Sequence, residues 1–363
     1  MYDQIRSDIL FGMLYAVVAV LSLIACCYLL FRQGNAFARD VTPPVRLRRW
    51  TAAYFAAAAL CHLWYMPIFF LTSSESIMMT DLVGGLLDSM TVFPLAIIVM
   101  LNMLQDRRRP LWPIALMIAP FVAGSVFSIA TLSYALIPKL YVYLLLLSIC
   151  IVIYMVRATR QYGRWLRDNY ADLEHKEVWQ SFVVLAFILL LIVFYAFVSE
   201  GLLSQYAMQV IGIVLIGYLL WRVETLSDLS LSDLPLSIRN PSASPLGLSK
   251  NIGPLLKMYC EDPQLYLQND VSLSLLANQI GINRSYLSKH FAMQGISYNE
   301  YINGLRIQHF VNLYHEAAAT HQPVTVQQLA YQSGFRSYNT FSVAFKKTMG
   351  MNTTEWIRDQ ISS

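Results

Sequence analysis

The sequence predicts an all-α protein in two parts, a bundle of seven transmembrane helices followed by a soluble domain with two helix-turn-helix units. Two observations lead to this prediction. First, 56% of the 363 residues are hydrophobic and only 13% are charged, whereas about a quarter of a soluble domain is charged. Second, the apolar excess ends before the last third of the chain, where Ala-x₃-Gly turns occur at Ala277–Gly281 and Ala330–Gly334. We expect a membrane domain over 1–222, a linker over 223–249 and a soluble domain over 250–363.

Seven apolar runs predict the membrane domain, because a helix needs about 20 apolar residues to cross a bilayer. The runs are 9–31, 50–72, 82–104, 111–132, 138–157, 178–198 and 205–222, and the last is the shortest.

Basic residues predict the orientation of these helices, because they concentrate in the first, third and fifth connections. They are Arg32, Arg39, Arg46, Arg48, Arg49, Arg107, Arg108, Arg109, Arg157, Arg160, Arg164, Arg167 and Lys176. The N-terminal tail and the other connections hold only Arg6 and Lys139. Since basic loops stay in the cytoplasm, the N-terminus is predicted outside and the soluble domain in the cytoplasm.

The first helix has a competing interpretation. Leu23–Cys26 resembles a lipoprotein cleavage box, and cleavage there would alter the first span. Few basic residues precede the box, and apolar residues continue past it through Phe31. We therefore expect the helix to be retained.

The five cysteines have no spacing typical of a metal site or a disulfide framework. They are Cys26, Cys27, Cys61, Cys150 and Cys260. We expect small buried apolar side chains, with no metal and no cofactor.

Residues 223–249 predict a flexible, partly extended linker, because Pro235, Pro241 and Pro245 lie among Ser, Asn and Gly. The leucines at its start are compatible with one or two further turns of the seventh helix.

The first helix-turn-helix unit is predicted from its caps and its apolar spacing. Ser272 is a candidate N-cap, Gly281 suits a tight turn, and Asn283 caps the following helix. In that helix Leu287 and Phe291 are spaced to point inward.

The second unit repeats this pattern. Thr325 and Gln328 form a capping box, Gly334 ends the first helix, and Phe341 and Phe345 are the inward residues of the next.

Between the units, Ser297 and Glu300 form another capping box and open a helix that runs to about residue 314. A helix of ~18 residues is about 27 Å long. With the packed units at its ends, it separates the two outer helices by about one DNA turn, roughly 34 Å.

Residues ~250–360 resemble the AraC/XylS family of transcription regulators. The resemblance rests on Leu-Arg-Ile at 305–307, on Gly334-Phe335, and on Phe341-x₃-Phe345-Lys346-Lys347-x₂-Gly350. It implies a domain that binds double-stranded DNA, in a bacterial protein that is not an enzyme. Phe310 and Thr353 depart from the family, which usually has Ala and Pro there, and both positions belong to the scaffold.

Helix phase selects the DNA-contacting side chains, and the selected positions match the family's base-contacting sites. Ser285, Ser288 and Lys289 point outward from the first unit, and Asn339, Ser342 and Val343 from the second. Lys pairs with guanine and Asn with adenine, so Lys289 and Asn339 are the main predicted readers. Arg284, Arg336, Lys346 and Lys347 are predicted to contact the DNA backbone.

Polar residues in apolar helices indicate function by default. Asp88 and His62 are therefore candidate ligand-binding residues, although for His62 a buried, hydrogen-bonded structural role is the favoured interpretation and ligand binding the alternative. Asn102 is expected to form a bond between helices.

These predictions combine into a regulator in the bacterial inner membrane that detects a small molecule or membrane signal and pairs as a homodimer on DNA. One alternative is a membrane-anchored regulator released by cleavage of the linker. Another is a transporter-like protein with an appended DNA-binding domain. A third is a soluble domain that binds protein, since residues 250–363 hold nine basic and seven acidic residues.

Overall fold

The computed structural model describes residues 8–32, 34–38, 41–133, 135–197, 201–229, 252–320 and 323–362. The chain forms two compact units. The first is Met1–Tyr162 with Val178–Asp228, and the second is Gly163–Glu177 with Leu229–Ser363. Within the described ranges every named element is a helix, so the predicted all-α fold is confirmed.

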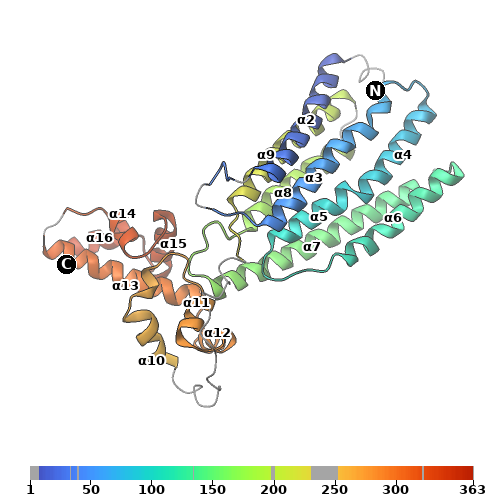
Figure 1. Ribbon diagram of the computed structural model, residues 1–363. Helices are drawn as coiled ribbons and strands as arrows, with labels where there is room; N and C mark the ends of the chain where they lie inside the picture. Colours follow the sequence, from blue (N-terminus) through green and yellow to red (C-terminus); the bar gives the residue numbers. More distant parts are fainter. Residues whose placement is uncertain are drawn as a thin grey trace. The chain divides into compact units, whose positions relative to one another are not determined.

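The first unit consists of long apolar helices (Figure 1). They are α2 (Ile9–Phe31), α3 (Val45–Trp64) with the 3₁₀ turn η1 (Met66–Phe69), α4 (Ser74–Met90), α5 (Val92–Met103), α6 (Trp112–Thr131), α7 (Ile137–Asn169), α8 (Trp179–Phe197) and α9 (Leu202–Thr225). Six stretches in the described residues are long and apolar enough to cross a membrane, judged by length and composition alone. Here α3 and η1 count as one stretch, as do α4 and α5. The shorter apolar stretch Trp179–Leu191 lies in α8.

Packing in this unit leaves large apolar side chains exposed on its outer face. Helix α2 packs against α3 and α9, α3 against α5, and α4 against α6. Leu116, Leu190 and Leu203 remain 66%, 64% and 71% exposed. An extensive apolar surface of this kind fits contact with lipid.

Two expectations for the first unit are wrong. Cys27 and Cys150 are exposed on their helices rather than buried. The Asn102 side chain donates to the Ile98 carbonyl at 2.7 Å within α5, and not to a neighbouring helix. A carbonyl one turn back satisfies the amide locally, as Ser, Thr and Asn side chains in helices often do.

The second unit contains nine short or medium helices. They are α10 (Ile252–Leu256), η3 (Lys257–Glu261), η4 (Leu265–Leu267), α11 (Leu273–Ile280), α12 (Arg284–Met293), α13 (Tyr298–Ala319), α14 (Val326–Gln332), α15 (Tyr338–Met349) and α16 (Thr353–Ser362), counted over the described residues. Helix α13 connects the α11–α12 pair to the α14–α15 pair (Figure 1). It supplies Tyr298 and Ile302 to one apolar core and Ile307 and Phe310 to another.

The predicted domain boundaries did not anticipate the position of residues 163–177. This segment connects α7 to α8 along the chain, yet it belongs to the second unit. Helix α9 continues to Thr225, three residues past the predicted end of the seventh run. The predicted linker 223–249 lies outside the described residues from position 230 onward.

Candidate DNA-binding surface

The first helix-turn-helix unit has the predicted caps. The Ser272 hydroxyl accepts from the Leu275 amide at 3.2 Å, and Asn283 accepts from the Ser285 amide at 2.9 Å. Gly281 ends α11 with φ +80°, a conformation that costs a residue with a Cβ about 1–2 kcal/mol. The turn between α11 and α12 is therefore set by local sequence.

The second unit is built in the same way, with a tighter turn. Thr325 and Gln328 form the predicted capping box at the start of α14. Gly334 has φ +85°, and a Cβ there would lie 2.7 Å from the Leu267 Cα. Only glycine fits at this position, because the backbone of η4 passes directly over the turn.

The predicted inward residues are buried in both units. Leu287 and Phe291 are 0% and 2% exposed, and Phe341 and Phe345 are both 0% exposed. Phe310 stands with its ring 4.6 Å from that of Phe341. Phe310, which is larger than the Ala usual in the family, thus packs into the apolar core that holds Phe341 and Phe345.

The outer faces of α12 and α15, which we call the reading helices, carry the predicted DNA contacts. Ser285, Lys289, Asn339, Val343, Lys346 and Lys347 are exposed, and Arg284, Ser288, Arg336 and Ser342 are half-buried. Arg284 is the first residue of α12, whereas Arg336 precedes α15. The two Arg-Ser-Tyr tripeptides are therefore not equivalent, as predicted. Which atoms of DNA these side chains contact stays a prediction.

Lys347 is already engaged within the protein. Its ammonium lies 2.6 Å from the Glu300 carboxylate. That hydrogen bond, with the Ser297 backbone amide, lowers the pKa of Glu300 to about 2. Of the two neighbouring lysines, Lys346 is thus the more available for phosphate.

Arg306 of α13 joins the two helix-turn-helix units, which sequence reasoning did not predict. Its side chain is buried. The guanidinium donates to the carbonyls of Tyr266 and Gln268 at 2.7 and 2.9 Å and lies over the Phe335 ring. Arg306 thereby fixes the turn of the second helix-turn-helix unit, at Phe335, to the segment around Tyr266 and Gln268 that precedes the first helix-turn-helix unit.

Residues 168–177, which we call the acidic segment, pack onto the first helix-turn-helix unit. The segment holds Asp168, Asp172, Glu174 and Glu177 against one lysine. The Ala171 amide donates to the Val271 carbonyl at 3.2 Å, and the Asn299 amide group donates to the Ala171 carbonyl at 2.6 Å. Ala171 is fully buried in the first core. The segment is therefore an integral layer of the second unit.

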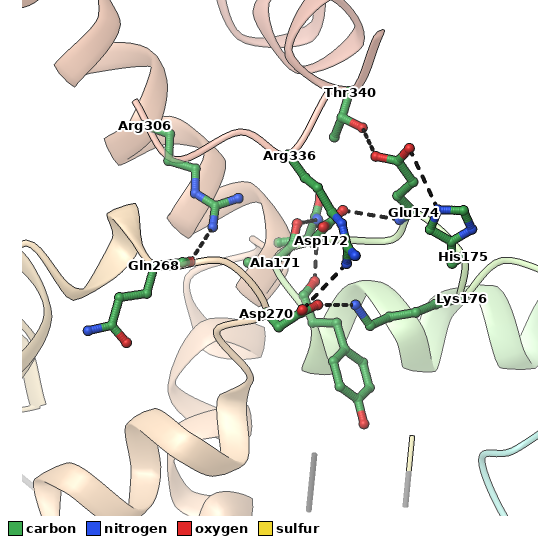
Figure 2. A network of polar contacts seen from close by, with 12 residues as sticks. Ala171, Asp172, Glu174, His175, Lys176, Gln268, Asp270, Arg306, Arg336 and Thr340 are labelled. Atoms are coloured by element: carbon green, nitrogen blue, oxygen red, sulfur yellow. Dashed lines mark hydrogen bonds and ion pairs between the residues drawn. The ribbon is translucent and has the colours of Figure 1, made fainter. Parts of the chain in front are cut away.

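The acidic segment also contacts residues predicted to bind DNA. Asn169, directly within it, accepts from the Arg284 Nε at 3.0 Å. Figure 2 shows Glu174 facing Thr340, which lies in the first turn of α15. The Thr340 hydroxyl donates to the Glu174 carboxylate at 3.5 Å.

Asp270 links the acidic segment to Arg336 through a network of ion pairs. Lys176 and Arg336 converge on its carboxylate at 2.7 and 3.5 Å (Figure 2). Burial raises the pKa of Asp270, but the two cations outweigh it and hold the pKa below its ordinary value. No periodicity in the sequence indicates this network, because its partners lie 66 and 94 residues apart.

The candidate ligand residues of the first unit lie in a polar cluster. Asp88 accepts from Trp64 Nε1 at 3.2 Å and from the Tyr65 hydroxyl at 3.0 Å. His62 is half-buried and contacts the Ala58 carbonyl at 2.8 Å and Gln209 at 3.2 Å. The hydrogen-bonded role favoured for His62 therefore accounts for both of its ring nitrogens.

An apolar cavity of about 240 Å³ lies elsewhere in the same unit. Its walls include Tyr54, Met100, Ile151, Met155, Leu185 and Leu215, from five helices. Residues of this kind accommodate apolar ligands or hydrocarbon chains. Among the described residues, no group of three or more His, Cys, Asp or Glu is placed to hold a metal ion.

Comparisons with known proteins concern only the second unit. Residues 276–359 match the family described as a helix-turn-helix domain. The TCP pilus virulence regulatory protein of Vibrio cholerae is 32% identical over 82 residues, which cover 23% of this chain and 28% of that protein. Two HTH-type transcriptional regulators of Staphylococcus aureus are 33% and 32% identical over 88 residues, or 24% of this chain and 11% of each.

The chain thus spans less than a third of the length of these relatives. No solved structure matches. The matched residues begin within α11 and end within α16, so they include both turns and both reading helices. Residues 276–359 are a helix-turn-helix domain of the AraC type.

Proposed function

We propose that this protein is a membrane-embedded transcription regulator that detects a signal in or across the membrane and binds specific DNA through its two reading helices. The observation that carries the proposal is the pair of capped units, each of which buries its aromatic anchors and exposes a polar face. Lys289 and Asn339 lie exposed on these faces. Lys reads guanine and Asn reads adenine in the major groove.

The length of α13 supports reading of two groove segments by one chain. Its 22 residues span about 33 Å at 1.5 Å per residue, close to one DNA turn. Helices at its two ends are therefore suited to successive major-groove segments on one face of the duplex.

The first unit provides two places where a signal can act. One is the polar cluster around Asp88 and His62, and the other is the apolar cavity. A ligand in either place favours whichever arrangement of the helices binds it more tightly. In this proposal the first unit is the receptor and the second unit binds the DNA. Both the second unit and the DNA lie in the bacterial cytoplasm.

The test uses the full chain in lipid nanodiscs and a library of random 40-base-pair duplexes. We expect selection of a two-part site with half-sites about one helical turn apart. Lys289→Ala should relax the sequence preference in one half-site, and Asn339→Ala in the other. Each change should weaken binding by about 5- to 150-fold, because a direct base contact contributes about 1–3 kcal/mol.

Matched controls are Lys257→Ala and Asn278→Ala, which alter exposed residues outside both reading helices. These two variants should bind like the unaltered chain. Unchanged affinity and preference in Lys289→Ala and Asn339→Ala would refute this choice of readers. Absence of any selected sequence would refute DNA recognition itself.

Release of the reader by proteolysis is the competing mechanism. Cell fractionation with a C-terminal tag separates the two. The receptor mechanism predicts that the tag stays with the membrane in induced cells, at full length. A soluble tagged fragment that retains DNA binding would favour release.

A further inference from the structure

We infer that the acidic segment, residues 168–177, is an inhibitory element that competes with DNA for the starts of both reading helices. The inference rests on the proposed DNA-binding function and concerns its regulation. The juxtaposition that carries it is contact with Arg284 at the start of α12 and with Thr340 at the start of α15, from a single ten-residue stretch.

The chemistry of the segment resembles that of its competitor. It carries four carboxylates and one lysine, while DNA presents a dense row of phosphates. Glu174 lies beside the first turn of α15, where the positive end of the helix dipole favours an anion. A DNA phosphate at that turn would meet this carboxylate and be repelled.

The segment also occupies Arg284, a residue predicted to contact the DNA backbone. Both Nε and Nη2 of Arg284 donate to the side-chain Oδ1 of Asn169. Contacts to phosphate fix the register of a protein on the duplex. While Arg284 is held by Asn169, α12 lacks the cation at its N-terminal end.

The segment is anchored firmly enough to hold this position. The Lys176 side chain is 4% exposed and lies 2.7 Å from Asp270. Ala171 is buried in the first core, and Tyr170 forms an isolated antiparallel bridge with Ser272. Displacement therefore requires both polar and apolar contacts to open.

The segment is at the same time the direct connection between two apolar helices. Helix α7 continues without a break to Asn169, and α8 begins at Trp179. A shift of either helix along its axis pulls on the segment through only a few residues of backbone. A movement of α7 or α8 in response to a signal is thereby transmitted through the backbone to the residues that contact the reading helices.

The experiment measures affinity of the full chain in nanodiscs for the duplex selected above, with Asn169→Ala, Glu174→Gln and the double variant. Asn169→Ala removes the acceptor of Arg284, and Glu174→Gln removes the negative charge beside Thr340. We expect tighter binding by about 2- to 10-fold each, and a larger gain in the double variant. Glu316→Gln, an exposed acid at the other end of α13, is the control for a general change in charge and should have a smaller effect.

Hydrogen exchange provides a second readout that is independent of the substitutions. The Ala171 amide should be protected in the free protein and should exchange faster when the duplex is bound, because DNA displaces the segment. Weaker or unchanged DNA binding by the double variant, or protection of 168–177 that persists on DNA, would overturn the inference and leave the DNA-binding proposal intact. Failure of every variant to bind any duplex would overturn both.

Discussion

At the residue scale, helix phase predicted which side chains turn inward but not which polar ones do. Leu287 and Phe341 are buried as their spacing indicates. Arg306 is also buried, yet arginine is normally a surface residue. Its acceptors are the carbonyls of Tyr266 and Gln268, 40 and 38 residues away. A local pattern cannot supply that information, because burial of Arg306 depends on where a distant backbone leaves two carbonyls unpaired.

Glu300 gives a pH-dependent prediction at the same scale. The pKa of its carboxyl is lowered from 4.5 to about 2 by Lys347 and the Ser297 amide. A lowered pKa in the folded state means that the charged form stabilises the fold. This contribution is complete above pH 4.5 and is lost as the pH falls to about 2.

Hydrogen exchange over 297–305, corrected for intrinsic rates, measures this effect in the full chain. Glu300→Gln retains the capping box, which accepts Gln as well as Glu, but cannot titrate. Protection in the unaltered chain should therefore exceed that of Glu300→Gln at pH 5, and the difference should vanish near pH 2. An identical pH dependence in both chains would contradict the assigned pKa.

At the scale of elements, the sequence predicted the existence of the helices better than their limits. The predicted run 82–104 is two helices, α4 from Ser74 and α5 from Val92, with a break at Thr91. Pro94 follows the break, and its missing N–H leaves a carbonyl of the preceding turn without a helical donor. Conversely, α13 continues to Ala319 rather than to about 314, because three alanines extend it with the best helix-forming residue.

The two turn glycines lead to an element-scale prediction. Both have positive φ, but only Gly334 lies against backbone, with Leu267 Cα and O at 2.7 and 2.8 Å from a built Cβ. Gly281→Ala should cost about 1–2 kcal/mol from conformation alone. Gly334→Ala should cost more, since η4 must also move.

Local opening free energies from hydrogen exchange in α11–α12 and in α14–α15 test this ranking. Gly304→Ala is a suitable control, because this position lies in the middle of α13 and a Cβ there meets no atom within 4 Å. It should stabilise its helix slightly. Equal losses in Gly281→Ala and Gly334→Ala would mean that the contact with Leu267 does not constrain the second turn.

At the scale of the whole molecule, the composition of the second unit constrains how the chain crosses the membrane. Residues 163–177 and the reader form one compact unit, so both must lie on the same side of any membrane. Any crossings between Glu177 and Leu229 are therefore even in number. A crossing by α9, one of the six stretches long and apolar enough to cross, would require a second crossing by α8. The 19 residues of α8 span about 28 Å, which suits a hydrocarbon core of about 30 Å.

Seven crossings satisfy this even number and agree with the orientation that the loop charges predict. Thirteen basic residues in alternate connections predict the orientation, whereas the even number of crossings follows from contacts such as the hydrogen bonds of Ala171 and Asn299. The sequence does not indicate that residues 163–177 belong to the second unit, because the acidic segment has no pattern that marks it as part of a distant domain.

Reporter fusions test the arrangement directly. Alkaline phosphatase, which is active only outside the cytoplasm, should be active when fused after residues 72, 133 or 201 and inactive after residues 109, 176 or 229. Green fluorescent protein at the same positions should give the reverse pattern, since it matures in the cytoplasm. The fusions after 201 and 229 decide between six crossings and seven. If α8 did not cross, position 201 would be inside and 229 outside, and the reader would be separated from both DNA and the acidic segment that packs against it.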